Sequence, residues 1–352
     1  MVVPYTANVE GNPQVSQRNC ITLAAVPETG RATLYDYSFK NGTNGIWYLD
    51  GQWPDGTSWH FGGIGDLQPY DDGINYGSSF FGIDGQDAYR NDFDTLRAGF
   101  ERLNFSMFSN YDVNDNMTIY FDVFHNGFFS FDYGNTSGYP YSTWIFAPGQ
   151  DMPPIIDITN PYLTQNSVDI MNSYGATEVY VHKSHVDILG KGNGGYTIEN
   201  NNAVSMYSVG VEGSFDLDDN TFNYAAGYSI GNTEIYSDEP GIIGARYAAA
   251  LDVGINPATG EIDCRMNYDP TRDPALYDYV YGPPSYFFGD TLYGPSILGQ
   301  IGDCRPLNVM GRGAPSQEAK DYVGTNLRTN AFIEQEVTYG TLSGDLFDLP
   351  AG

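Results

Sequence analysis

Basic residues are scarce in this chain: 15 lysine and arginine residues stand against 44 aspartate and glutamate residues, a formal net charge of −29. A nucleic-acid-binding protein needs a basic surface to neutralise phosphates, so this charge excludes nucleic acid as a partner. An acidic surface can attract cations, and acidic loops can equally do no more than keep a protein soluble. Composition leaves both interpretations open.

Long hydrophobic runs and cysteines are scarce too. No segment approaches the roughly 18 consecutive apolar residues of a membrane-spanning helix. The first residues, MVVPYTANVEGN, lack the basic start and apolar core of a signal peptide. We therefore expect either a cytosolic protein or a piece of a longer chain. The three cysteines, Cys20, Cys264 and Cys304, leave at least one thiol unpaired, which fits a partner outside the sequence or a buried free thiol.

Glycine (42), tyrosine (29) and phenylalanine (20) dominate the composition, a mixture that suits sheets and turns. Residues 103–133 alternate apolar and polar side chains on both sides of an Asp/Asn turn at 112–116, a pattern that predicts a β-hairpin. Its second limb runs about 17 residues, whereas strands of soluble proteins usually have about five or six. A tilted strand crosses a bilayer in about 9–11 residues, so this one is long enough to cross and project beyond.

A second hairpin, at about residues 196–230, nearly repeats the first, with its turn at 216–220. Aromatic and aliphatic residues occupy one face, and glycine and serine occupy much of the other. Small residues cannot fill the core of a sandwich, but they can line a wet lumen while the aromatic residues face lipid. A fifth strand is predicted at about 327–346, and short helices are predicted near 165–173 and after Ser316, the expected N-cap.

The connections differ greatly in length. Both hairpin turns are short, whereas the connections at 134–195 and 235–327 are long, which is typical of bacterial outer-membrane barrels. A strand-like stretch at 178–188 then belongs to an outside loop or extends the barrel wall. Five strands cannot close a barrel. We therefore expect an all-β fold: an extracellular loop region at 1–95, then a partial transmembrane β-barrel at 96–352 with about five crossing strands and large loops that contain short helices.

The third connection and the last strand carry a family resemblance. The stretches CRPLNVMGRG (304–313), SQEA (316–319) and LSGDLFDLPAG (342–352) resemble the barrel of TonB-dependent outer-membrane receptors. The resemblance implies a 22-stranded barrel around a plug, in the outer membrane of a Gram-negative bacterium, that imports an oligosaccharide, a peptide or a metal chelate. Its partners would be membrane lipid, the nutrient and the TonB energising complex, which acts through the plug. Signal peptide, plug and C-terminal strands are not found, so we expect an internal barrel fragment.

The resemblance also implies a disulfide between Cys264 and Cys304, because outer-membrane loops meet an oxidising environment; Cys20 is expected to be free. No metal or cofactor is expected. The two Asp/Asn turns start like calcium loops but lack the required glycine and glutamate. His182 and His185 would point to opposite faces of a strand.

We expect no enzyme, because neither a nucleophile elbow nor a phosphate loop occurs. Aromatic residues of the connections are candidates for stacking on a ligand, although each could instead pack the loops: Trp47, Trp53, Trp59, Tyr141 and Trp144. Their acidic surroundings disfavour a strongly anionic nutrient. The alternatives are a secreted all-β carbohydrate-binding module and a β-rich hydrolase. In either of them a second sheet must bury the apolar row of Phe105, Phe121, Val209, Phe222 and Tyr228, which an importer leaves exposed.

Overall fold

The computed structural model describes residues 27–34, 53–71, 98–134, 154–183, 185–189, 196–218, 220–272 and 303–345, with the backbone of short strands elsewhere. The chain divides into two compact units. We call the first the connection unit (Met1–Asp94, Gly134–Tyr196 and Pro240–Thr325) and the second the strand unit (Thr95–Tyr133, Thr197–Glu239 and Asn326–Gly352). Among the described residues, no helix is long and apolar enough to cross a membrane.

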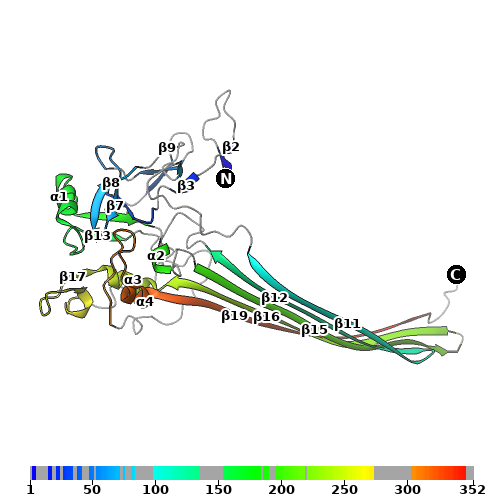
Figure 1. The fold of residues 1–352 in the computed structure, drawn as a ribbon. Helices are drawn as coiled ribbons and strands as arrows, with labels where there is room; N and C mark the ends of the chain where they lie inside the picture. The colour runs from blue at the N-terminus through cyan, green and yellow to red at the C-terminus, as the bar shows by residue number, and fades with distance from the viewer. Residues whose placement is uncertain are drawn as a thin grey trace. The chain divides into compact units, whose positions relative to one another are not determined.

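Five long strands form the sheet of the strand unit (Figure 1). They are β11 (Gly99–Asn114), β12 (Met117–Gly134), β15 (Tyr196–Leu217), β16 (Asn220–Ile242) and β19 (Gly324–Gly344). Their order in the sheet is their order in the chain. Antiparallel strands therefore dominate, which confirms the predicted all-β class and both long hairpins.

Both hairpin turns lie at one end of this sheet, as the sequence predicts. The Ser214 amide donates a hydrogen bond to the Asn116 carbonyl (3.0 Å), which places the second turn beside the first. Each turn is closed by a threonine hydroxyl that donates to an aspartate: Thr118 to Asp112 (2.8 Å) and Thr221 to Asp216 (2.7 Å). These residues serve turn geometry, for which Asp and Asn are suited.

The connection unit contains its own five-stranded antiparallel sheet. Its order is β13 (Ile155–Asp157), β14 (Glu178–His182), β4 (Arg31–Thr33), β7 (Trp59–Gly63) and β8 (Asp66–Pro69). Helix α1 (Gln165–Ser173) forms where predicted, with Thr164 as its N-cap. The strand predicted at 178–188 is wrong beyond His182, because helix α2 (Val186–Leu189) replaces it.

The remaining elements of this unit are short. In the third connection lie α3 (Gly244–Leu251), the hairpin β17 (Val253–Ile255) and β18 (Ile262–Cys264), η2 (Arg265–Asn267) and α4 (Gln317–Val323). As predicted, Ser316 caps α4 and Gly324 ends it. The N-terminal segment adds β1 (Val2–Pro4), β2 (Val15–Gln17), β3 (Ile21–Leu23), β5 (Ser38–Asn41), β6 (Trp47–Asp50), β9 (Ile74–Asn75) and β10 (Phe81–Ile83).

A packed hydrophobic core holds the connection unit together. Its buried residues come from all three connections and include Trp53, Phe61, Met171, Val181, Tyr247, Leu307, Met310 and Val323. The sequence predicted loop regions with short helices and strand-like pieces there, but no shared core. Part of the first connection is instead folded, because apolar side chains that lie far apart in the chain bury one another.

Candidate functional site: the two faces of the long sheet

The hydrogen-bonded register assigns the side chains of the long strands to two faces, one largely apolar and the other rich in small residues on β15 and β16, since directly paired residues share a face. Phe105 pairs with His125, whose Nδ1 lies 2.8 Å from the Ser205 hydroxyl. Ser205 therefore lies on the same face as Phe105, and alternation along β15 places Val209 on that face too. Val209 pairs with Tyr228 of β16, so the face is defined across four strands. We define the apolar face as the side that carries Phe105, Met107, Phe121, Tyr207, Val209, Phe215, Phe222, Tyr228 and Ile230.

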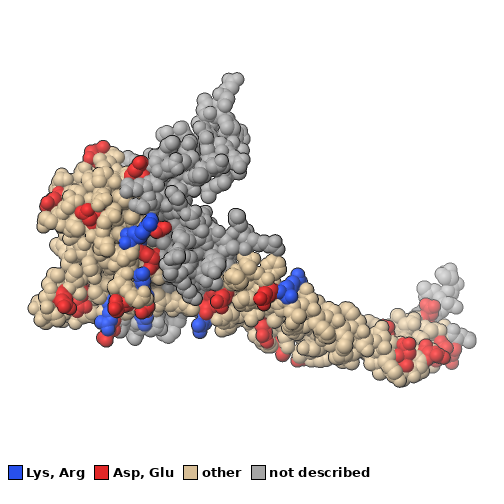
Figure 2. Space-filling view, in the orientation of Figure 1, with Lys and Arg blue, Asp and Glu red and all other residues tan. Residues whose placement is uncertain are grey.

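This face is exposed along most of its length. Phe105 is 52% exposed, Val209 46% and Tyr228 38%. Phe222 is an exception at 8%, because it stacks on Phe215 with ring centroids 5.5 Å apart. The expectation of a fully exposed row is therefore wrong at this residue. Figure 2 shows few charged side chains along the middle of the visible sheet surface, with acidic residues gathered near the turns.

The small-residue face is organised around Tyr120. Its ring lies over Gly210 and Gly227, where an added Cβ would come within 2.2 Å and 2.6 Å of the tyrosine oxygen. Its hydroxyl also meets the hydroxyl of Tyr339 on β19. An added Cβ at either position would displace this ring, so Gly210 and Gly227 let Tyr120 lie close against β15 and β16.

Strand β19 reverses the pattern of the other four. Tyr339 meets Tyr120, which lies on the small-residue face. The apolar row of β19, which consists of Ile333, Val337 and Tyr339, therefore belongs to that face. Glu336 and Glu334 consequently lie on the apolar face, beside Tyr228. The sequence predicts the alternation of this strand but not the face on which each row lies.

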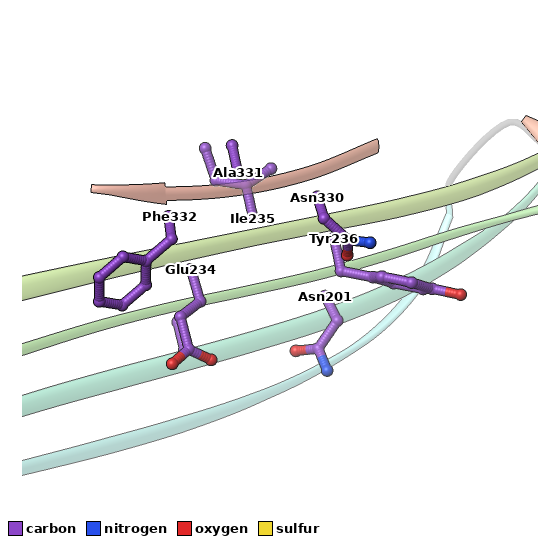
Figure 3. A pocket seen from close by; sticks show the side chains of 8 residues that line it. Asn201, Glu234, Ile235, Tyr236, Asn330, Ala331 and Phe332 are labelled. Carbon is purple, nitrogen blue, oxygen red and sulfur yellow. The ribbon is translucent and has the colours of Figure 1, made fainter. Parts of the chain in front are cut away.

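The apolar face becomes polar at the end opposite the turns. There Arg328 pairs with Asp238 (Nε–Oδ2 3.0 Å), and Tyr236 donates to the same carboxylate (3.1 Å). A shallow groove of about 300 Å³ lies beside this cluster on β15, β16 and β19. Figure 3 shows the Asn201, Glu234, Tyr236, Asn330 and Phe332 side chains on one side of the sheet. No pattern in the sequence singled these residues out, because three strands contribute to the groove.

The connection unit is held together by residues 304–313, which we call the central segment. The Gly311 amide donates to the Thr29 carbonyl (2.9 Å), and the Met310 carbonyl accepts from Gly65 (3.0 Å). Lys183 donates to the Gly311 carbonyl (2.6 Å). One stretch of the third connection is thus bonded to the other two.

Cys264 and Cys304, the pair that the resemblance implies, form a disulfide with Cα atoms 6.0 Å apart. Both cysteines are fully buried in the core. The bond anchors the start of the central segment to β18. Cys20 lies outside the described residues.

A buried ion pair adjoins the central segment. The Lys183 ammonium is fully buried and donates to Asp187 (2.7 Å) as well as to Gly311. Burial lowers the pKa of this ammonium, and the Asp187 carboxylate opposes that shift. The pair binds α2 to the central segment, which is a structural role that no sequence motif indicated.

The two histidines next to this lysine have separate partners. His182 Nε2 lies 3.0 Å from the Thr33 hydroxyl, and His185 Nε2 lies 2.6 Å from the Tyr247 hydroxyl. Burial, followed by the charge of Arg31, holds the pKa of His182 well below its ordinary value. Burial lowers the pKa of His185 to about 4. Among the described residues, no group of three or more metal-ligating side chains occurs.

Of the predicted stacking residues, the structure describes the side chains of Trp53 and Trp59 only. Trp53 is only 2% exposed, donates from Nε1 to the Ala32 carbonyl (3.0 Å) and packs edge-on against Tyr174, so it offers no stacking face. Trp59 lies half-buried beside it, with ring centroids 6.0 Å apart. The Trp47 side chain, Tyr141 and Trp144 lie outside the described residues. Trp53 is therefore a core residue rather than a ligand contact.

Comparison of this chain with protein-family models, with curated proteins and with solved structures finds no match.

Proposed function

We propose that this chain is a sector of an outer-membrane receptor of the TonB-dependent kind, which takes up a nutrient at the expense of energy from the inner membrane. In this proposal the long sheet is part of a transmembrane β-barrel wall. On β11, β12, β15 and β16 the apolar face contacts lipid and the small-residue face lines the lumen; β19, whose Glu334 and Glu336 lie on the lipid side, does not share this pattern. The observation that carries the proposal is the aligned apolar stretch on one face of neighbouring strands.

The height of this stretch matches a membrane. Counted from the turns, it covers residues 103–111, 207–215 and 222–230, nine positions in each strand. At a rise of about 3.3 Å per residue, nine positions span about 30 Å along the strand. A tilt of about 45° reduces this to about 21 Å, close to the apolar band of about 25 Å around outer-membrane barrels.

Exposure of this stretch argues against the alternatives. A secreted carbohydrate-binding sandwich or a β-rich hydrolase would cover the apolar row with a second sheet. Phe105, Phe121, Val209 and Tyr228 are instead 38–52% exposed. On β15 and β16, the glycine and serine residues of the opposite face provide little apolar surface for a sandwich core, whereas they suit a barrel lumen.

The long connections all leave the sheet at the end opposite the turns, because each turn joins two strands at the other end. We place that end outside the cell and the turns in the periplasm, as in barrels with short periplasmic turns. The connection unit would then meet the nutrient first. Its acidity disfavours an anionic nutrient and leaves a neutral oligosaccharide, a peptide or a cationic metal complex as candidates. The TonB complex would act through the plug domain of such a receptor.

Spin labels on neighbouring residues test the lipid contact. Val209→Cys and Ser208→Cys point to opposite faces of β15, and each is made in a Cys20→Ser background that retains the buried disulfide. In proteoliposomes of the full chain, the label at 209 should collide with oxygen, which concentrates in lipid. The label at 208 should collide with a water-soluble nickel chelate. A matched pair on β16, Tyr228→Cys and Ser229→Cys, should repeat the alternation.

Equal accessibility of both labels in each pair would contradict the proposal, as would a water-exposed label at 209 or 228. A dry label at 209 without access to oxygen in the bilayer would indicate a second protein layer and favour the sandwich alternative.

A further inference from the structure

The groove at the polar end of the apolar face has a small-residue floor between larger side chains. Ala203 pairs with Glu234 across β15 and β16, and Asn201 pairs with Tyr236 one step further. Phe332 and Asn330 of β19 line the other side. Because alanine stands where its neighbours carry long side chains, a hollow of about 300 Å³ remains. Figure 3 shows Phe332, Glu234 and Asn201 directed to one side of the sheet, away from Ile235.

Three of the polar side chains that line this groove have no hydrogen-bond partner among the described residues. The Tyr236 hydroxyl is engaged with Asp238, which also holds Arg328. By contrast, no described residue hydrogen bonds to the side chains of Asn201, Glu234 or Asn330. Two amides and a carboxylate together provide both donors and acceptors. Such groups suit neighbouring hydroxyls, which each donate and accept.

The aromatic groups add a flat apolar surface. Phe332 is 60% exposed, and the Tyr236 ring lies on the same side of the sheet (Figure 3). Burying an aromatic ring against C–H groups is favourable, and it leaves the groove's polar groups free to bind at the edge. A pyranose ring offers this combination of an apolar face and a rim of hydroxyls.

The charge around the groove limits the ligand further. Glu234 and the nearby Glu199 are acidic, while Arg328 is already paired with Asp238. An anionic group such as a phosphate would therefore be repelled. The sugar that fits is uncharged.

The position of the groove indicates how such a sugar would arrive. Glu234 stands four residues beyond Ile230, the last residue of the apolar stretch on β16, and on the same face. Four residues span about 13 Å along the strand, or about 9 Å in height at a tilt of 45°. Lipid head groups extend about 5–8 Å beyond each side of the hydrocarbon core, so Glu234 stands at about the outer edge of the head-group layer.

We propose that this groove binds the uncharged sugar head group of a membrane glycolipid, whose acyl chains lie along the apolar stretch. Phe332 stacks on the sugar ring, and Glu234, Asn201 and Asn330 bind its hydroxyls. This proposal rests on the proposed function for the placement of the acyl chains, while the sugar contacts follow from the groove itself.

Native mass spectrometry of the full chain, released from polyoxyethylene detergent micelles, tests the proposal. The probes are digalactosyldiacylglycerol, a phosphatidylglycerol with the same acyl chains, and the deacylated digalactosylglycerol. The neutral glycolipid should bind at least tenfold more tightly than either of the other two. Ala203→Leu, which fills the hollow, and Glu234→Ala should each weaken its binding at least tenfold.

Two further variants control for charge and for general damage. Glu234→Gln keeps an acceptor and adds donors, so glycolipid binding should stay within threefold of the wild type. Ile235→Ala, on the opposite face, should leave binding unchanged.

Several outcomes would overturn the assignment. Equal binding of both lipids would show no sugar recognition, and an unaffected Ala203→Leu variant would place binding elsewhere. Loss of binding in Glu234→Gln as large as in Glu234→Ala would indicate a cationic ligand. Equal affinity for the deacylated sugar would indicate a free saccharide. The spin labels separate the two proposals. If the label at 209 contacts lipid but both lipids bind equally, only the glycolipid proposal is refuted. If the label at 209 is exposed to water, the proposed function is refuted.

Discussion

Acidification from pH 7.5 to 4.5 should destabilise the connection unit through His185. Its imidazole is buried against Tyr247, and burial lowers its pKa from an ordinary 6.5 to about 4. The nearby charges of Asp187 and Lys183 act in opposite directions and leave burial dominant. Below pH 6.5 the unfolded chain therefore binds a proton at this site that the folded chain does not bind. Stability is fully present above pH 6.5 and is lost as the pH falls towards 4.

The size of the loss follows from the two pKa values. Each unit of pKa difference corresponds to about 1.4 kcal/mol, so complete protonation of the unfolded state alone costs about 3.4 kcal/mol. At pH 4.5 the folded imidazole is itself partly protonated, which reduces the loss to about 2.5 kcal/mol. That is a large part of the 5–15 kcal/mol typical of a domain.

Urea unfolding of the full chain at the two pH values, followed by tryptophan fluorescence, measures this loss. Trp53 reports on the connection unit because it is buried in its core. The control is His185→Gln, whose amide stays neutral and can still hydrogen bond to Tyr247. Asp55 and Asp66, whose carboxyl pKa values are lowered by side-chain hydrogen bonds, remain in both proteins. The change in unfolding free energy between the two pH values should therefore be about 2.5 kcal/mol smaller in the variant.

A difference below about 0.5 kcal/mol between the two proteins would refute the reasoning, because it would mean that His185 titrates alike in both states. Direct observation of the imidazole by NMR provides a second check that does not depend on the variant. An imidazole resonance of His185 that titrates near pH 6.5 in the folded protein would also refute the reasoning.

Two further predictions concern the connection unit. Reduction of the Cys264–Cys304 disulfide, which closes a separation of 40 residues, should lower the unfolding free energy by about 4 kcal/mol in the entropic model; an unchanged urea midpoint in reductant would contradict this. Gly65→Ala should destabilise far more than Gly56→Ala. Both glycines have positive φ, but an added Cβ at Gly65 meets the Tyr162 carbonyl oxygen at 1.9 Å, whereas Gly56 has open space. The unfolding free energies of the two variants should differ by more than about 1 kcal/mol. Equal thermal midpoints would show that the Tyr162 backbone moves to accommodate the added methyl group.

Local patterns predicted the long strands and their turns well. Period-two alternation extends over about nine or more residues in four of the five strands, and a slip of one residue would exchange the faces, so the register is strongly specified. Helix α4 was equally predictable from the sequence, because Ser316 and Gly324 mark its two ends. In each case the determining residues are neighbours in the sequence.

The core of the connection unit could not be predicted in the same way. Val181 and Met310 become buried together only after three distant segments meet. Trp53 was a candidate ligand contact because its aromatic face could stack on a ligand, and only the tertiary contact with Tyr174 reveals its burial. The reversed faces of β19 likewise depend on one contact between strands, that of Tyr120 with Tyr339.

The central segment also determines when this protein can complete its folding. Lys183 donates to the Gly311 carbonyl, which lies 128 residues further along the chain. The Thr29 carbonyl accepts from the amide of the same glycine. During synthesis, the first two connections must therefore remain without their central partner until β15 and β16 have been made. Closing such long loops is slow, since their entropy is lost before the contacts form. The half-assembled connections would meanwhile expose Phe61 and Val181, which makes the interval before residue 311 emerges the stage at which this chain is most prone to aggregate.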